Sequence, residues 1–275
     1  MNFGKTNKFT AYTTLALCII VIAFAVFTCP NFLEAKGLNE QFDEGIRPSI
    51  SIRAAQPQEE FAFIWYYLQN MPFFIKNGYS ITLPDHERFE KLAKIPPDNM
   101  NTKKEETYDF FDQHIYNKVD YKNGLSALAD INDKLISVFE RFETLNKQWG
   151  FKVFNHYEVV LTLYGVGGHF DAKNGQVFLK TTKDGKFVLR DPFYVIVHEM
   201  VHIGIDDNIV NRFRLNHWEK ERVVDLICSI KFADILKDYK LQPPGEKKLD
   251  TFINNDSISN LPKAIEEYIT KYPRN

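Results

Sequence analysis

Apolar residues follow a helical period over much of the first half of the chain. Between residues 58 and 149 they recur at three- and four-residue spacing, which is typical of amphipathic helices. The pattern predicts helices at 84–94, 105–117 and 126–148, and a last one at 261–272. Residues 59–75 are more strongly apolar, with interruptions at Gln69, Asn70 and Pro72. We expect a buried helix there that ends near Pro72; a hairpin that dips into a membrane is the alternative.

The pattern changes after Gly150, where β-branched and aromatic residues become frequent. Three segments have the composition of strands, namely 152–163, 176–181 and 186–189. Two dipeptides are typical of turns between antiparallel strands, Asn174-Gly175 and Asp184-Gly185. Helical spacing then returns from Asp191 to about Tyr239. The expected fold is α+β, mostly helical, with a small mixed or antiparallel sheet directly before the helix near Asp191.

The first 30 residues have a different pattern from the rest. Residues 11–27 carry no charge, Lys5 and Lys8 precede them, and Pro30 follows. This is the layout of a secretory signal peptide or an uncleaved signal anchor. The segment is at the short end of the roughly 17–25 residues that span a membrane as a helix. We therefore expect residues 1–30 to direct the rest of the protein out of the cytoplasm, as a secreted, periplasmic or membrane-anchored body, and residues 31–57 to form a tether.

Composition excludes several classes of protein. Lys and Arg number 34 against 36 Asp and Glu, for a net charge of −2, and 44% of the residues are hydrophobic. An intrinsically disordered chain has fewer apolar residues and a larger net charge. Proteins that bind nucleic acid through its phosphates carry a basic excess, so no nucleic-acid partner is expected. Three cysteines cannot form a disulfide framework.

One helix carries the residues that suggest chemistry. Asp191-Pro192 is a helix start, with a capping residue followed by proline at the first position. His198 and His202 then stand four residues apart, on the same face, so that both imidazoles can reach one metal ion. Glu199 projects beside that ion, where it can take a proton from water. The residues between them are apolar, and buried imidazoles and carboxylates are unfavourable unless they are coordinated or hydrogen-bonded.

A second helix is predicted after Asn216, and it supplies a carboxylate. Glu221 and Asp225 share one of its faces, in a segment that is otherwise apolar. A buried carboxylate needs a cation, which a metal ion held by two neutral imidazoles provides. Glu221 is the expected third ligand, and Asp225 the acceptor for the outer ring N–H of a ligating histidine. Glu219 is a weaker candidate, because the residue four positions on is Val223.

The two motifs, HEMVH at 198–202 and ERVVD at 221–225, together resemble the gluzincin branch of the zinc metallopeptidases, the thermolysin-like enzymes. The resemblance covers about residues 150–240. It implies a zincin-like domain at 150–275 behind a helical region at 58–149, with Zn²⁺ as cofactor. Carried over by position, it implies three zinc ligands, a general base and an outer-shell acceptor: His198, His202 and Glu221, Glu199, and Asp225.

The sequence departs from that family in one respect. Thermolysin-like enzymes have a further catalytic histidine downstream of the glutamate ligand, and here no histidine follows His217. The group that steadies the developing oxyanion is therefore unassigned. Tyr164 and His169, in a glycine-rich segment before a strand, and His217, directly before the ligand helix, are the candidates, each with a packing or surface role as the alternative.

The predicted function is zinc-dependent hydrolysis of peptide bonds in a peptide or protein substrate, outside the cytoplasm. We expect the substrate to add as a strand along an edge near 165–170. Two alternatives remain open at this stage. One is a membrane-tethered, non-catalytic binding or scaffold protein on a zincin-like fold, and the other is a hydrolase of a non-peptide amide.

Overall fold

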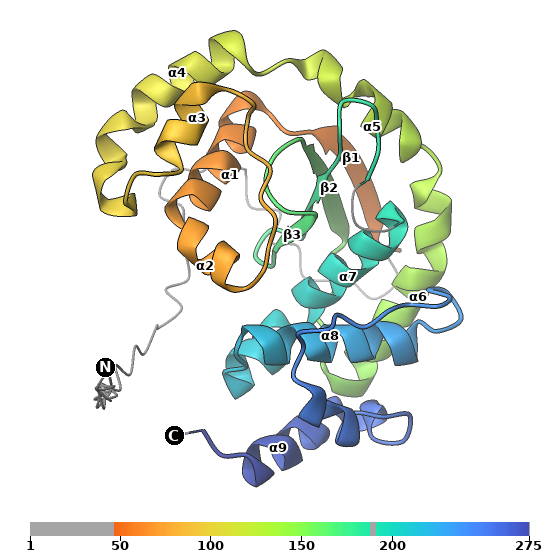
Figure 1. Ribbon diagram of the computed structural model, residues 1–275. Helices are drawn as coiled ribbons and strands as arrows, with labels where there is room; N and C mark the ends of the chain where they lie inside the picture. Colours follow the sequence, from red (N-terminus) through yellow and green to blue (C-terminus); the bar gives the residue numbers. More distant parts are fainter. Residues whose placement is uncertain (1–46, 188–190, 275) are drawn as a thin grey trace, which may run out of the picture. The chain divides into compact units, whose positions relative to one another are not determined.

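A mixed sheet of four strands is the element on which the helices of this α+β fold are arranged (Figure 1). The computed structural model describes residues 47–187 and 191–274. The strands are β1 (Ser49–Ala54), β2 (His156–Thr162), β3 (Gly168–Asp171) and β4 (Gln176–Lys180), in the order β1-β2-β4-β3. β2 is parallel to both β1 and β4, and β3 is antiparallel to β4. The predicted fold class is thus confirmed, and β3 is an edge strand.

The strand β1 was not expected from the sequence. Residues 49–54, which the sequence pattern places in a tether, pair with β2 from Ser49↔His156 to Ala54↔Leu161. The partner strand lies about a hundred residues further along the chain, so no local signal announces the pairing. The predicted signal segment at 11–27 lies outside the described residues. Within the described ranges, no helix is both long and apolar enough to cross a membrane.

The helices between β1 and β2 differ in extent from the predicted ones. They are α1 (Pro57–Gln69), α2 (Met71–Lys76), α3 (Glu87–Leu92), α4 (Lys104–His114), α5 (Lys122–Ala127) and α6 (Ile131–Trp149). The single helix expected at 59–75 is two helices that meet at Asn70, and Pro72 lies in the first turn of α2 instead of ending a helix. Proline is tolerated there because the N–H groups of a first turn have no helical partner. The helix expected at 126–148 is likewise divided between α5 and α6.

The turn signals of the second half gave mixed results. Asn174-Gly175 joins β3 to β4, and Gly175 has a φ of 66°, a conformation that glycine adopts without a steric penalty. Asp184-Gly185 also lies in a turn, since the N–H of Gly185 bonds to the carbonyl of Thr182. No strand follows it at 186–187, and the remainder of the expected strand falls on residues 188–190, outside the described part.

The helices after the sheet place the two motifs. They are α7 (Pro192–Ile205), which continues into a π-helical segment at Asp206–Asn211, α8 (His217–Lys231) and α9 (Leu261–Lys271). Asp191 caps α7 by accepting from the N–H of Phe193, and Asn216 and Glu219 form a capping box at the start of α8. α7 packs on β3 and β4 on one side and on α8 on another (Figure 1).

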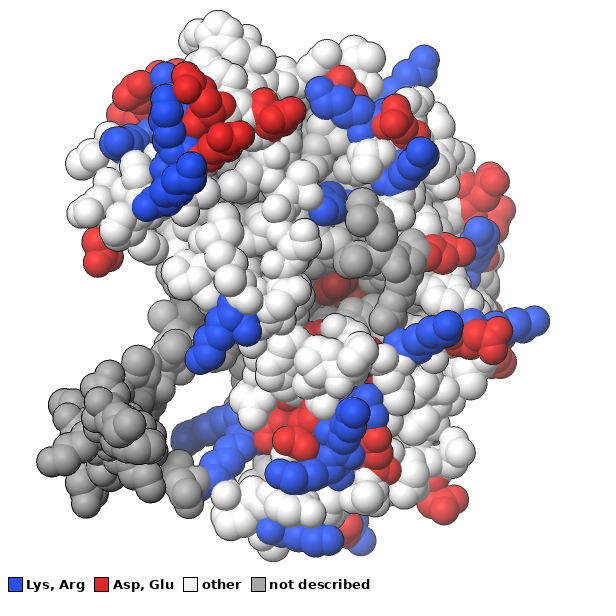
Figure 2. All heavy atoms as spheres, in the orientation of Figure 1, with Lys and Arg blue, Asp and Glu red and all other residues white. Residues whose placement is uncertain are grey.

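The two faces of the sheet are covered by different helices. Val177 and Leu179 of β4 belong to the main core with α7, whereas Phe178 points to the other face. On that face the centroid of its ring lies 4.3 Å from the ring centroid of Phe63, which belongs to α1. This alternation is that of a strand buried on both sides. On the face drawn in Figure 2, described Lys and Arg side chains are interspersed with Asp and Glu.

A buried carboxylate joins the first helices to the sheet. Glu60 of α1 is fully buried, and its Oε1 accepts from the backbone N–H groups of Leu163 (2.9 Å) and Tyr164 (3.0 Å) directly after β2. Its Oε2 accepts from the hydroxyl of Tyr121 at 2.7 Å. Burial raises the pKa of Glu60 to about 7, although the three hydrogen bonds oppose it.

Glu60→Leu is expected to lower the free energy of unfolding by about 2–5 kcal/mol, because it leaves two buried backbone N–H groups without an acceptor. Glu60→Gln keeps an acceptor for them and should lose less. Since the folded-state pKa of Glu60 is raised, the wild type binds more protons folded than unfolded between pH 4.5 and 7, and its stability relative to Glu60→Gln should fall as pH rises through that window. Urea denaturation at several pH values measures both effects, and equal midpoints for Glu60→Leu and wild type would contradict this role.

Candidate metal centre

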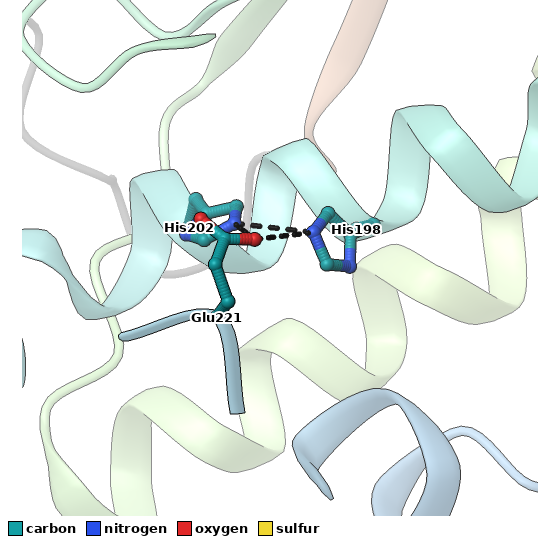
Figure 3. A group of neighbouring side chains, drawn as sticks. All are labelled: His198, His202 and Glu221. Atoms are coloured by element: carbon teal, nitrogen blue, oxygen red, sulfur yellow. Dashed lines mark hydrogen bonds and ion pairs between the residues drawn. The ribbon is translucent and has the colours of Figure 1, made fainter. Parts of the chain in front are cut away.

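Three side chains from two helices converge on one point (Figure 3). His198 and His202 come from α7 and Glu221 comes from α8, and all three are buried. Their donor atoms lie within 4.8 Å of one another, a grouping that can hold a metal ion. The separation of four residues on α7 puts the two imidazoles on one face, and the packing of α8 against that face brings the carboxylate to them.

The distances between the donor atoms fit a metal ion. The Nε2 atoms of His198 and His202 are 3.1 Å apart, and Glu221 Oε2 lies 3.5 Å from the first and 3.4 Å from the second. Ligands at 2.0–2.2 Å from a tetrahedral zinc ion are about 3.3 Å from one another. The three atoms therefore have the spacing of three corners of such a tetrahedron, and two imidazoles with one carboxylate are a donor set that suits this ion.

The charges of the three ligands respond strongly to one another. Burial alone would raise the pKa of Glu221, but the two imidazoles and Lys220 outweigh it and hold that pKa well below its usual value. Burial lowers the pKa of His202 to about 3, against the attraction of Glu221. Burial alone would lower the pKa of His198, but hydrogen bonds with Cys228 and Glu221 and the charge of Glu199 outweigh it and hold that pKa well above its usual value. Because a metal binds neutral imidazoles, a bound ion would take the place of the proton on His198.

The outer nitrogen of His198 is held by a short chain of hydrogen bonds. Its Nδ1 lies 2.6 Å from the hydroxyl of Tyr239, which donates to Asp225 Oδ1 at 2.9 Å. Asp225 itself is 3.8 Å from that nitrogen and fully buried. Asp225 thus lies on the outer side of His198, but the direct hydrogen bond predicted from the sequence is replaced by one through Tyr239. Such outer partners fix the orientation of a ligating imidazole.

The second imidazole is held by stacking. His202 lies on the ring of Phe170 in β3, with 4.8 Å between ring centroids and 6° between the planes. The ammonium of Lys220 lies 5.1 Å from the centre of the same ring. Nδ1 of His202 is buried and makes no hydrogen bond to any residue that the structure describes. The orientation of His202 therefore depends on the edge strand.

Glu199 faces the edge strand across a glycine. A Cβ atom at Gly168 would lie 2.5 Å from Glu199 Oε1 and 2.7 Å from Val195 Cγ1, so only glycine lets β3 approach the carboxylate so closely. Glu199 is buried and lies next to His198 in the sequence. Burial raises its pKa to about 7, with His198 opposing and Glu221 adding to the shift. A carboxylate of this kind can both take up and return a proton near neutral pH.

The three oxyanion candidates lie in different places. His217 is beside the ligands, with Nδ1 at 3.8 Å from Glu221 Oε1 and Nε2 at 2.8 Å from the hydroxyl of Tyr79. His169 alternates with Gly168 and Phe170 and packs on the other face of the sheet, against Phe63 and Phe178. Tyr164 packs against Phe111 in the cluster around α1 and α4.

Glu219, the weaker candidate for the third ligand, has other partners. Its carboxylate accepts from the backbone N–H of Asn216, from the hydroxyl of Tyr268 at 3.0 Å and from Arg274 at 2.7 Å. These bonds fix the start of α8 and the end of the chain. Glu221, two residues on, therefore faces the imidazoles while Glu219 faces away from them.

Several polar groups near the ligands had no signal in the sequence. Tyr239 and Gln242 follow α8 in a segment that turns back at Asp238, a residue with a φ of 57°. Tyr79 comes from the loop after α2. None of the three stands at a recognisable spacing from a ligand, so only the folded chain brings them to the site.

No known protein family, curated protein or solved structure matches this chain. The buried histidines and glutamate are consistent with the HExxH…E site of the zincins, and that consistency rests on the geometry described here.

Replacing any of the three ligands with alanine should abolish tight binding of a divalent metal, because each contributes one of the three donor atoms. Asp225→Asn should weaken binding by about 10–100-fold, the usual effect of losing an outer partner. Titration with Zn²⁺ against a competing chelator measures the affinities. Glu219→Gln is the matched control in α8 and should bind as the wild type does; a wild-type affinity in His202→Ala would contradict the ligand set.

Proposed function

We propose that this protein is a zinc-dependent hydrolase of peptide bonds, built like a gluzincin. The observation that carries the proposal is the position of Glu199 at the edge of a sheet, close enough to a donor set of two histidines and a glutamate for His198 and Glu221 to shift its pKa. A structural metal site needs no proton acceptor next to it. The presence of one favours catalysis over the non-catalytic scaffold that the sequence left open.

Each residue has a distinct part in this proposal. His198, His202 and Glu221 would hold zinc, which supplies Lewis acidity to water and to the substrate carbonyl. Glu199 takes the proton of the attacking water and returns it to the leaving amine. Its raised pKa suits both halves of this transfer. Tyr239 and Asp225 keep the imidazole of His198 in the orientation that it needs to bind.

The edge strand offers a place for the substrate. The N–H of Lys180 bonds to the carbonyl of Gly167, so these two form a hydrogen-bonded pair. In an antiparallel ladder such pairs alternate with non-hydrogen-bonded ones. Gly168 and Phe170 then belong to the second kind, and their N–H and C=O groups point away from β4. An extended peptide can pair with them, beside Glu199 and the ligands.

The cellular location is also part of the proposal. The uncharged segment at 11–27, preceded by lysines, supports export of the body or its anchoring to a membrane with the body outside. Hydrolysis of a non-peptide amide requires the same ligand set and base. The strand-like edge at β3 is the feature that favours peptides.

Glu199→Gln should retain zinc and lose activity by about 10²–10⁴-fold, because it keeps the size of the side chain but cannot accept a proton. A library of unstructured peptides, read by mass spectrometry with wild type and variant in parallel, measures this. Glu140→Gln, at an exposed position of α6, is the control. Hydrolysis by Glu199→Gln at the wild-type rate would remove Glu199 from its assigned role.

Gly168→Ala tests the contact between the edge strand and Glu199. The new methyl group would displace the carboxylate of Glu199. Because a misplaced base transfers a proton less well, kcat should fall by at least about tenfold. Zinc affinity should change little, since no ligand atom is touched. Gly78→Ala, where φ is 76° and the new methyl group meets no neighbour, loses stability through backbone strain without touching the site, and so controls for general loss of stability. Equal kcat in Gly168→Ala and wild type would show that the approach of β3 is not needed.

A further inference from the structure

The chain returns to the ligands after α8. We call residues 237–246 the return strap. It is attached at several points: Lys237 O accepts from the hydroxyl of Tyr194 at 2.8 Å, and the N–H of Glu246 bonds to Trp218 O at 3.1 Å. Between these points Tyr239 contacts His198, and the backbone N–H of Gln242 donates to Asp225 Oδ2. The strap is thus fixed on the outer partner of one ligand.

The side chain of Gln242 approaches the ring nitrogen of His198 that faces the other two ligands. Its Nε2 donates to Glu221 Oε2 at 3.0 Å and lies 3.5 Å from His198 Nε2. These are two of the three atoms that face one another in the donor set. A fourth group around a tetrahedral ion is about 3.3 Å from each of the other three. The amide nitrogen therefore lies beside two of the three donor atoms, at distances close to those between neighbouring groups around an ion.

The other polar groups near Glu221 lie closest to its Oε1 atom. Lys220 Nζ is 3.5 Å and His217 Nδ1 is 3.8 Å from Oε1, whereas both imidazole Nε2 atoms and the Gln242 amide approach Oε2. Oε2 is the oxygen that would bind the ion. Of these three neighbours, Gln242 is thus the one that contacts the oxygen facing the two imidazoles.

We propose that Gln242 is a catalytic residue of the hydrolysis proposed above, on which this inference rests, and that its amide N–H stabilises the oxygen of the reacting carbonyl. That N–H donates to Glu221 Oε2 when no substrate is bound, and it turns to the substrate oxygen as negative charge develops there. Side-chain amides serve this purpose well, because they donate without titrating. The attachments of the strap hold the backbone of Gln242 in place, so that little reorganisation is required. Gln242 thus supplies the oxyanion donor that the sequence left unassigned.

Two variants of the full-length, zinc-loaded chain test this. Gln242→Met keeps the length of the side chain without a donor, and Gln242→Ala removes it. Both should lower kcat by about 10²–10³-fold with KM little changed, because the bond forms chiefly in the transition state. A second readout is the affinity for a phosphonate peptide, a tetrahedral analogue, measured by calorimetry. It should weaken by a similar factor, while the affinity for Zn²⁺ stays at the wild-type value.

Lys240→Ala, an exposed position in the same strap, is the control and should match the wild type in every measurement. Unchanged kcat and phosphonate affinity in both Gln242 variants would overturn the assignment. So would a large loss of zinc affinity, which would make Gln242 a ligand or a support for the ligands. If the wild type hydrolyses no peptide, the proposed function fails, and phosphonate binding alone decides: equal affinities in wild type and variants, or no binding by the wild type, refute the role of Gln242.

Discussion

The structure depends on the packing of α7 against α8 with charged and polar groups buried at their contact. His198, Glu199 and His202 lie in a helix whose other positions are nearly all core positions, and Glu221 and Asp225 lie in a second such helix. Burying these groups separately would cost several kcal/mol each, so they are tolerated only together. Their mutual placement fixes the crossing of the two helices, and the sheet and the strap are arranged around it. Stability and the proposed chemistry therefore both require the same packing of α7 against α8.

The sequence alone was sufficient to identify the three side chains that converge from the two helices. A separation of four residues determines a shared face, so the meeting of His198 with His202 follows from local geometry. Glu221 could be added because a carboxylate in an apolar helix needs a cation. Tyr239 and Gln242 could not be found in this way. They reach the ligands through a turn at Asp238, and nothing in the residue pattern specifies where a chain goes after such a turn.

The same distinction explains the fold. The amphipathic pattern located the helices, and the asparagine–glycine dipeptide located the turn between β3 and β4. The residue pattern did not locate β1, because the partner strand of Ser49–Ala54 is distant in the sequence and β1 is only partly buried. It also gave the wrong role to Pro72, which is compatible with the end of one helix and with the first turn of the next. Local rules leave such alternatives open, and tertiary packing decides between them.

The edge strand and the return strap approach the ligands from different elements, and each contributes what the other lacks. Gly168 brings the backbone of β3 to Glu199, and Phe170 fixes His202 by stacking. The strap orients His198 from outside through Tyr239 and adds an amide donor inside through Gln242. In the proposed reaction, Glu199 on α7 would act on the water while Gln242 on the strap acts on the carbonyl oxygen. Because the edge strand and the strap are both fixed to the two ligand helices, a small shift in the crossing of α7 and α8 would misplace every one of these groups together, and activity should be more sensitive than stability to changes at that crossing.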